Sequence, residues 1–343
     1  MNDRGIKTSQ VDLIKNHLFQ QSEDRIEEAQ RAWSAMRGII ESDSDSVLME
    51  YMRWFACLLN GSTREKDVYD QIAKESKGVV NATNLLSALE STAVTYAALF
   101  NPMSEKWNQY PLSVRDSISV LNDLEVKQMR PLLLAVATRF SPKELATSLQ
   151  HFVSWIVRLN IAGGSKAGRL DTFYANLAYE VYKPDTTIKS YTQLYSSSRN
   201  AIPNDTQFKA DFATFRVKVS KTARYYLRKL ELRAGGSTKL GWEPTEDVLT
   251  VNLEHVMPRT PAASWSEQDI ETHATRLGNL ALMQADDNVN ADGLPFDQKK
   301  PILSKSTFRL TEMIGEFQTW GTADIERRQK MLAEFAPGTW PVN

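Results

Sequence analysis

Residues 248–258 read VLTVNLEHVMP, and a second apolar run, LGNLALM, follows at residues 277–283. Both runs are short and mainly apolar, as buried strands are. We predict one strand from Val248 to Val256, which Pro258 ends because proline lacks the N–H that a strand ladder requires. The second run predicts a strand from Leu277 to Met283.

The segment after the second run reads QADDNVNADGLPFDQKK, residues 284–300, and its pattern predicts helix. Asp286 and Asp287 are candidates for a helix cap, and Pro295 with Phe296 is typical of the start of a further helix. The predicted order is therefore strand, loop, strand and helix. In such a unit, side chains from a strand end and from the following helix can converge on one metal ion.

The chain before these strands has a helical pattern. One apolar stripe, with Ser22 as its expected N-cap, consists of Ile26, Ala29, Trp33, Met36 and Ile40. Similar periodicity runs through residues 46–59, 63–76, 80–100, 113–123, 127–140, 142–160 and 169–182. We therefore predict an all-helical domain over residues 21–205, with its boundary in the turn-rich segment SSSRNAIPND at residues 196–205.

Composition limits the classes of function. The 41 Lys and Arg residues almost balance the 42 Asp and Glu residues, so a nucleic-acid partner requires a local basic surface. The single cysteine, Cys57, cannot form an internal disulfide, and the four histidines have no zinc-finger spacing. No apolar run approaches the ~20 residues that span a bilayer, and the N-terminus is polar. We expect a cytoplasmic protein.

A local basic surface is present in residues 207–240, where nine basic residues accompany only Asp211 and Glu231. If residues 221–233 are helical, Tyr226, Leu227 and Leu230 form an inward face. The cations Lys221, Arg224 and Arg228 then follow one another along a different face and could contact a phosphate backbone. A solvated helix face without a ligand explains the same pattern equally well.

Several motifs from residue 245 to residue 341 resemble one family when taken together. They are EHVMP at 254–258, Trp265, LGNLAL at 277–282, Asn288, PFDQKK at 295–300 and IERRQKMLAEFAPGTWP at 325–341. Their order and spacing resemble the HNH, or His-Me finger, nucleases, and more closely the C-terminal nuclease domain of GmrSD-type modification-dependent restriction endonucleases. The resemblance implies a mainly α chain, in which a large helical body precedes an α+β domain, residues 206–343, with a small ββα-metal core.

The resemblance also implies roles for individual residues. His255 becomes the general base, and Asn279 orients the base or its loop. Asn288, and less firmly Glu254, become oxygen ligands of Mg²⁺ or Mn²⁺. Lys299 and Lys300 become contacts to a DNA phosphate. Without the family pattern, a histidine after a strand is usually structural, and Asn279 is an ordinary turn residue.

Residues that the resemblance leaves without a role have simpler interpretations. Asn290 is a helix-cap candidate, and it ranks below Asn288 because only Asn288 falls at the family's spacing. His273 lies in a polar segment and is expected to be solvent-exposed. Trp265 and Trp340 are expected in the core rather than stacked on bases.

A second resemblance lies at the N-terminus, where MNDRGIKTSQVDLIKNHLF is similar to the end of the ParB-like module of the same family. The Asp-Gly-Gln-Gln-Arg motif that opens that module does not occur in the chain. We therefore expect residues 1–20 to be the tail of a truncated sensor module, with no nucleotide hydrolysis by this chain alone. A companion chain could supply the missing ParB-like NTPase module.

Two classes of function follow from these observations. The first is a metal-dependent DNA endonuclease that restricts foreign, modified DNA in phage defence. The second is a non-catalytic DNA-sensing or interaction subunit that needs a partner chain. The intact motif residues favour the endonuclease.

Overall fold

A computed structural model of the chain describes residues 9–40, 44–125, 127–163, 167–235, 250–258 and 265–343. The chain divides into two compact units. The first, the helical unit, comprises Met1–Val153 and Ser165–Arg199, together with Asn343. The second, the hairpin unit, comprises Ser154–Gly164 and Asn200–Val342. The domain limits predicted at residues 20 and 205 stay predictions, although the second lies close to the change of unit near residue 200.

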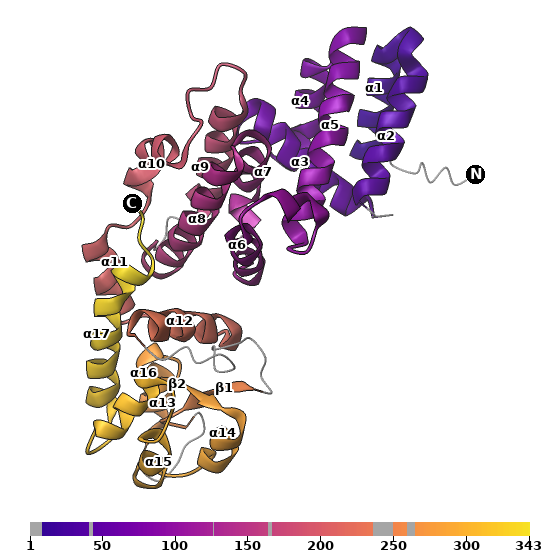
Figure 1. The fold of residues 1–343 in the computed structure, drawn as a ribbon. Coiled ribbons are helices and arrows are strands. Elements are labelled where there is room, and N and C mark those ends of the chain that lie inside the picture. Colours follow the sequence, from indigo (N-terminus) through magenta and orange to yellow (C-terminus); the bar gives the residue numbers. More distant parts are fainter. Residues whose placement is uncertain (1–8, 41–43, 126, 164–166, 236–249, 259–264) are drawn as a thin grey trace. The chain divides into compact units, whose positions relative to one another are not determined.

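The helical unit consists of amphipathic helices, as predicted from the apolar periodicity. They are α1 (Gln10–Ser22), α2 (Ile26–Ile40), α3 (Asp45–Asn60), α4 (Val68–Glu75), α5 (Val79–Phe100), α6 (Leu112–Asp123), α7 (Arg130–Arg139), the first part of α8 (Pro142–Ala162), α9 (Ala167–Tyr182) and α10 (Tyr191–Ser198). The long helix α5 contacts α1, α2, α3, α4, α6 and α7, and Figure 1 shows it among the first four helices.

The predicted stripe of α2 is largely buried, because Ala29, Trp33 and Met36 are each at most 3% exposed. The N-cap prediction for Ser22 was wrong. Ser22 is the last residue of α1, and its hydroxyl donates to the Leu18 carbonyl instead of accepting from α2. A short 3-10 turn, Glu23–Arg25, separates the two helices.

The hairpin unit holds two strands and a set of helices. Its elements are the end of α8, α11 (Asp205–Phe212), α12 (Ser220–Arg233), β1 (Val251–His255), α13 (Glu267–His273), η7 (Leu277–Asn279), β2 (Leu280–Gln284), α14 (Ala285–Ala291), α15 (Phe296–Leu303), α16 (Arg309–Glu312), η8 (Met313–Glu316) and α17 (Thr322–Thr339). Among the described residues, β1 and β2 are the only strands, and they form one antiparallel pair. The described chain is therefore mainly α, as predicted.

The register of the strand pair places His255 opposite Leu280 and Val251 opposite Gln284. Because α14 begins directly after Gln284, it starts at the end of the hairpin away from His255. Both α12 and α14 contact both strands, and Figure 1 shows α12 on one side of the hairpin and α14 with α15 on the other. The hairpin is thus held between helices.

Two sequence predictions in this region were wrong in detail. Residues Leu277–Asn279 form a 3-10 turn and not the start of a strand. The N-cap of α14 is Gln284 in an extended conformation, so Asp286 and Asp287 lie in the first turn of the helix. The start of α15 at Phe296, with Pro295 as N-cap, was predicted correctly.

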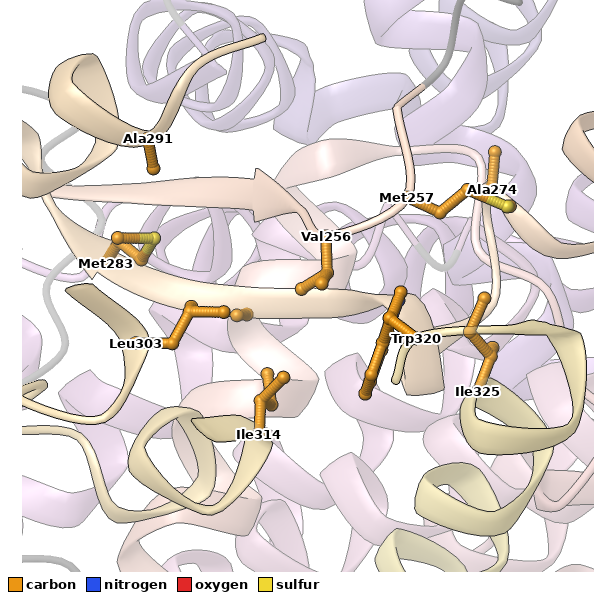
Figure 2. Packing of buried hydrophobic residues seen from close by; sticks show 10 residues of the cluster. Val256, Met257, Ala274, Met283, Ala291, Leu303, Ile314, Trp320 and Ile325 are labelled. Atoms are coloured by element: carbon orange, nitrogen blue, oxygen red, sulfur yellow. The ribbon is translucent and has the colours of Figure 1, made fainter. Parts of the chain in front are cut away.

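A hydrophobic cluster joins the strands to the surrounding helices (Figure 2). It includes Val256 just after β1, Met283 on β2, Ala291 at the end of α14 and Trp320 before α17. Figure 2 shows these four side chains beside the two strands. The end of β1 and the inner face of α14 therefore share one core.

None of the helices formed by the described residues combines the length and apolarity needed to cross a membrane.

Candidate functional site

The end of β1 places the predicted acid and the predicted base on opposite sides of the strand. Successive side chains of a strand point to opposite faces, and here Glu254 is only 5% exposed whereas His255 is partly exposed. The His255 side chain is therefore partly accessible at the end of the strand. His255 is also the last residue of the ladder, opposite Leu280.

Asn279 fixes the backbone that follows His255. Its side chain is fully buried, and its Oδ1 accepts from Met257 N at 2.7 Å and from Trp320 Nε1 at 3.2 Å. Its Nδ2 donates to the carbonyls of Met257 at 2.9 Å and Ala274 at 3.2 Å. In addition, Val256 N donates to the Asn279 carbonyl at 3.1 Å. Asn279 therefore sits where it can hold the base-bearing segment, but it has no free polar atom for a substrate in this arrangement.

Lys299 and Glu254 form a buried ion pair. Lys299 is 2% exposed, and its Nζ binds Glu254 Oε1 and donates to the His255 carbonyl at 3.0 Å. The pKa of the Glu254 carboxyl is raised above its ordinary value, because the effect of burial exceeds the opposing effect of the Lys299 ammonium. The predicted phosphate contact of Lys299 needs correction, because both its contacts lie inside the fold. The structure also gives no support to Glu254 as a metal ligand, since its carboxylate is buried and engaged by Lys299.

The neighbouring Lys300 has a different environment. It is partly exposed, and it lies on the same helix, α15. The DNA contact predicted for Lys300 is therefore compatible with its position and stays a prediction.

Asn288 lies in the middle of α14, three residues before the buried Ala291 and hence on the same face of the helix. Its Oδ1 is buried and has no hydrogen-bond partner among the described residues. Asn290 is exposed, and Val289 is 74% exposed. An unpartnered buried amide oxygen is costly unless something binds it, so Asn288 and not Asn290 has the environment of a ligand residue.

The donor set fits a hard divalent cation bound in part by the substrate. The described residues hold no group of three or more His, Cys, Asp or Glu side chains that could bind a metal. Mg²⁺ commonly keeps several waters and binds few protein ligands together with phosphate oxygens. The single amide oxygen of Asn288 is consistent with such a site.

The turn that carries Asn279 rests directly on α17. An added Cβ at Gly278 would lie 2.2 Å from the Ile325 carbonyl oxygen and 3.1 Å from Gln329 N, so only glycine permits this approach. Gly278 N donates to Gln329 Oε1 at 3.2 Å. The contact with α17 explains why the LGN segment turns before β2 begins.

Arg328 supports the same turn through its side chain. Its guanidinium is buried, with the residue only 1% exposed, and Nη1 donates to the carbonyls of Leu277, Gly278 and Leu280 at 3.2, 2.9 and 2.7 Å. Burial lowers the pKa of Arg328 to about 9, so the side chain remains a cation at neutral pH. Sequence reasoning assigned no role to this arginine, although it lies in the IERRQKMLAEF motif. The sequence did contain a signal, because Arg328 recurs with the apolar residues Ile325 and Leu332 at three- and four-residue steps. This spacing predicts that Arg328 lies on the buried face of the helix.

The Gly278→Ala variant should destabilise the protein by about 1–3 kcal/mol or more, because an inserted methyl group would collide with backbone atoms of α17. Thermal unfolding of the variant and of Gly38→Ala measures the effect. An added Cβ at Gly38, in helix α2, meets nothing within 4 Å, so this control should be stabilised by about 0.5–1 kcal/mol. Equal unfolding temperatures for the two variants would contradict the proposed packing.

The predicted basic helix is present as α12. Its inward residues Tyr226, Leu227 and Leu230 are at most 2% exposed, as predicted. Lys221 is exposed, and Arg224 and Arg228 are partly exposed. The Nε of Arg224 is buried without a hydrogen-bond partner among the described residues. Of the basic residues in this region, Lys209 pairs with Glu334 at 2.6 Å, and Lys239 lies outside the described residues.

Other predictions have mixed outcomes. Trp340 is 2% exposed and Trp265 packs against the core cluster, as expected. His273 is not solvent-exposed, because its side chain is 13% exposed and its Nε2 lies 3.4 Å from Glu326 Oε1. Cys57 is a buried free thiol.

Comparison with known protein families finds a match for part of the chain. Residues 202–335 match the family model described as the C-terminal domain of GmrSD restriction endonucleases. The resemblance to the C-terminal domain of GmrSD-type restriction endonucleases is confirmed over this segment, whereas the HNH type stays a prediction. The match includes both strands, α14 and α15, and it does not extend to the helices before residue 202. The ParB-like tail proposed for residues 1–20 lies outside it and stays a prediction. No curated protein matches the chain.

Proposed function

We propose that the hairpin unit, whose residues 202–335 match the C-terminal domain of GmrSD restriction endonucleases, is a metal-dependent DNA endonuclease of the HNH, or His-Me finger, type. The observation that carries the proposal is the buried amide oxygen of Asn288 on α14, which has no hydrogen-bond partner among the described residues. In the same unit His255 is partly exposed at the end of β1, and α14 contacts both strands. The two strands form one antiparallel pair and α14 follows β2 directly, which supports the proposal of a ββα core.

His255 acts as the general base in this proposal. Hydrolysis of a phosphodiester requires removal of a proton from the attacking water, and a neutral imidazole suits that step near neutral pH. Asn279 holds the backbone that follows His255, because its side chain binds both the N–H and the carbonyl of Met257. A fixed backbone at the base is an advantage because proton transfer depends on geometry.

Asn288 would hold the divalent ion through its Oδ1, with DNA phosphate oxygens and waters as further ligands. When bound, Mg²⁺ or Mn²⁺ supplies positive charge that stabilises the developing charge on the phosphate. Glu254 is not included among the ligands, because Lys299 engages its carboxylate.

DNA is the proposed substrate, and α12 with Lys300 provides its basic contacts. Because α12 packs on both strands, its cations belong to the unit that carries His255. The family description concerns restriction endonucleases, and we propose the same role for this chain, directed at foreign and modified DNA. A companion chain with a ParB-like NTPase module remains part of the proposal.

The direct test is cleavage of supercoiled plasmid by the purified chain, with Mg²⁺ or Mn²⁺ and with EDTA. We expect relaxed or linear product only in the presence of metal. Modified and unmodified plasmids should be compared, and the assay repeated with a ParB-like NTPase partner. Absence of cleavage under all these conditions would favour the second class of function, a non-catalytic DNA-sensing or interaction subunit.

The basic residues of α12 give a separate prediction. Replacing Lys221, Arg224 and Arg228 with glutamine should weaken DNA binding regardless of sequence. It should also reduce the slope of log K against log salt by up to about 3 units, at ~0.9 per phosphate contact. The single-turnover rate at saturating DNA should change much less, because these contacts position the duplex and do not activate water.

The matched control replaces Lys66, Lys74 and Lys77 in the helical unit with glutamine, which removes the same net charge elsewhere. Binding isotherms over a salt series compare the two variants. If the α12 variant retains the wild-type slope, its cations form a solvated helix face and the DNA must be bound elsewhere.

A further inference from the structure

We propose that Lys299 is a positioning residue for His255, holding the backbone of the proposed base from inside the fold. This inference rests on the proposed function, because it assigns Lys299 a role in the orientation of the same imidazole. It replaces the phosphate contact that the sequence predicted for Lys299.

The position of Lys299 on α15 is the first observation. Phe296, Lys299 and Leu303 recur at three- and four-residue steps, so they lie along one face of the helix. Phe296 packs against the hydrophobic cluster and Leu303 belongs to it. Lys299 is 2% exposed between them. The lysine is therefore directed into the unit, whereas the next residue, Lys300, is accessible to a ligand.

The contacts of the ammonium are the second observation. Lys299 Nζ bridges Glu254 and the carbonyl oxygen of His255, at 3.0 Å from the latter. It thus binds the side chain of one residue and the backbone of the next. Glu254 and His255 are the last two residues of β1. The Lys299 ammonium therefore holds the peptide group between His255 and the next residue.

The arrangement around that peptide is the third observation. The His255 carbonyl is bound by Lys299, and Val256 N donates to the Asn279 carbonyl. Both the N–H and the carbonyl of Met257 are bound by the Asn279 side chain. Lys299 from α15 and Asn279 from η7 therefore hold successive backbone groups of the same short segment.

A role in stability alone accounts poorly for this lysine. A buried ion pair seldom stabilises a fold more than apolar side chains of similar size would, since both charges lose their hydration. The Glu254 carboxylate offsets the burial of the ammonium. The remaining bond, to the His255 carbonyl, is the one that connects the pair to the proposed chemistry.

The test compares Glu254→Gln with the double variant Glu254→Gln/Lys299→Met. In the Glu254→Gln background, loss of the ammonium leaves no buried carboxylate without a partner. The comparison therefore tests the hydrogen bonds of Lys299, including the one to the His255 carbonyl, without the penalty of an unpaired buried charge. We expect single-turnover cleavage at saturating DNA to be about 10- to 100-fold slower in the double variant, as expected for a misplaced catalytic group. DNA affinity should change by less than about twofold, because Lys299 is not a phosphate contact. Lys305→Met, at an exposed lysine just after α15, is the control and should leave the cleavage rate unchanged.

A second readout does not depend on cleavage. The chain has four histidines, so ¹⁵N-histidine labelling gives a small set of imidazole signals in which His255 is assigned from the His255→Ala spectrum. Loss of Lys299 should shift or broaden the His255 signal and leave the other signals in place. If the wild-type chain does not cut DNA, the proposed function fails, whereas this spectrum still tests the positioning role.

An unchanged His255 signal together with an unchanged rate at saturating DNA would overturn the proposal. A reduced salt dependence of binding with an unchanged rate would restore Lys299 as a phosphate contact and overturn it as well. Should the double variant not fold, Lys299→Arg is the second variant, since it keeps a cation beside Glu254 but moves the donor. The proposal then requires a shifted His255 signal and slower cleavage, and wild-type behaviour in both would reject it.

Discussion

Replacing His255 with alanine should reduce single-turnover DNA cleavage by about 10²- to 10⁴-fold, the range expected for loss of a general base. The structural reason is that the His255 side chain is partly exposed, while the backbone around it is held by other groups. β1 pairs with β2, with His255 opposite Leu280, and Asn279 binds the backbone of Met257. DNA affinity should be nearly unchanged, because binding is assigned to the basic helix α12. Rapid-quench cleavage at saturating DNA measures the rate.

The control for this variant is the stability of the fold. His255→Ala should keep the helical circular dichroism and the unfolding temperature of the wild type. His273→Ala removes a partly buried contact to Glu326 and should not slow cleavage. Loss of helical signal in His255→Ala would indicate a structural histidine and would count against the assignment of the base.

The second large effect concerns the metal. Asn288→Ala should weaken Mn²⁺ binding by at least about tenfold, because the variant loses the amide oxygen that has no partner among the described residues. Electron paramagnetic resonance of free Mn²⁺ during a titration measures this directly, without any cleavage reaction. Zinc should not restore activity to the variant, since an oxygen ligand set favours harder cations.

Asn290→Ala is the matched control, because it removes the same amide from an exposed position two residues further along α14. Its Mn²⁺ affinity should equal that of the wild type. Equal losses in both variants, or no loss in either, would place the ion elsewhere in the unit.

Much of the fold could be predicted from local pattern. The helices of the helical unit follow the apolar periodicity, and β1 ends before Pro258 as expected. The prediction that the second strand begins at Leu277 was wrong, because a contact with residues far away in the sequence makes this segment a turn. Gly278 packs against Ile325 and Gln329 of α17, and the hydrogen bond to Gln329 joins residues 51 positions apart. A local pattern carries no information about such a contact.

The residues of the candidate site could be predicted where residue type and spacing determine their role. They could not be predicted where the role depends on whether the side chain is buried. The spacing of the family motifs favoured Asn288 over Asn290 as the metal ligand. In the structure the Asn288 Oδ1 is buried and has no hydrogen-bond partner among the described residues. Lys299 was misassigned because lysine is usually exposed. Its partner Glu254 lies 45 residues earlier, so the ion pair is visible only after α15 is placed against β1.

The most direct test of the central claim, that His255 and Asn288 belong to one metal-dependent nuclease site, is the single-turnover cleavage rate measured against Mn²⁺ concentration. Wild type, His255→Ala and Asn288→Ala should be compared at the same saturating DNA concentration. We predict that the Asn288→Ala curve is displaced to higher Mn²⁺ concentration and that the His255→Ala curve remains near the baseline at every concentration. Curves for both variants that coincide with the wild-type curve would contradict the claim.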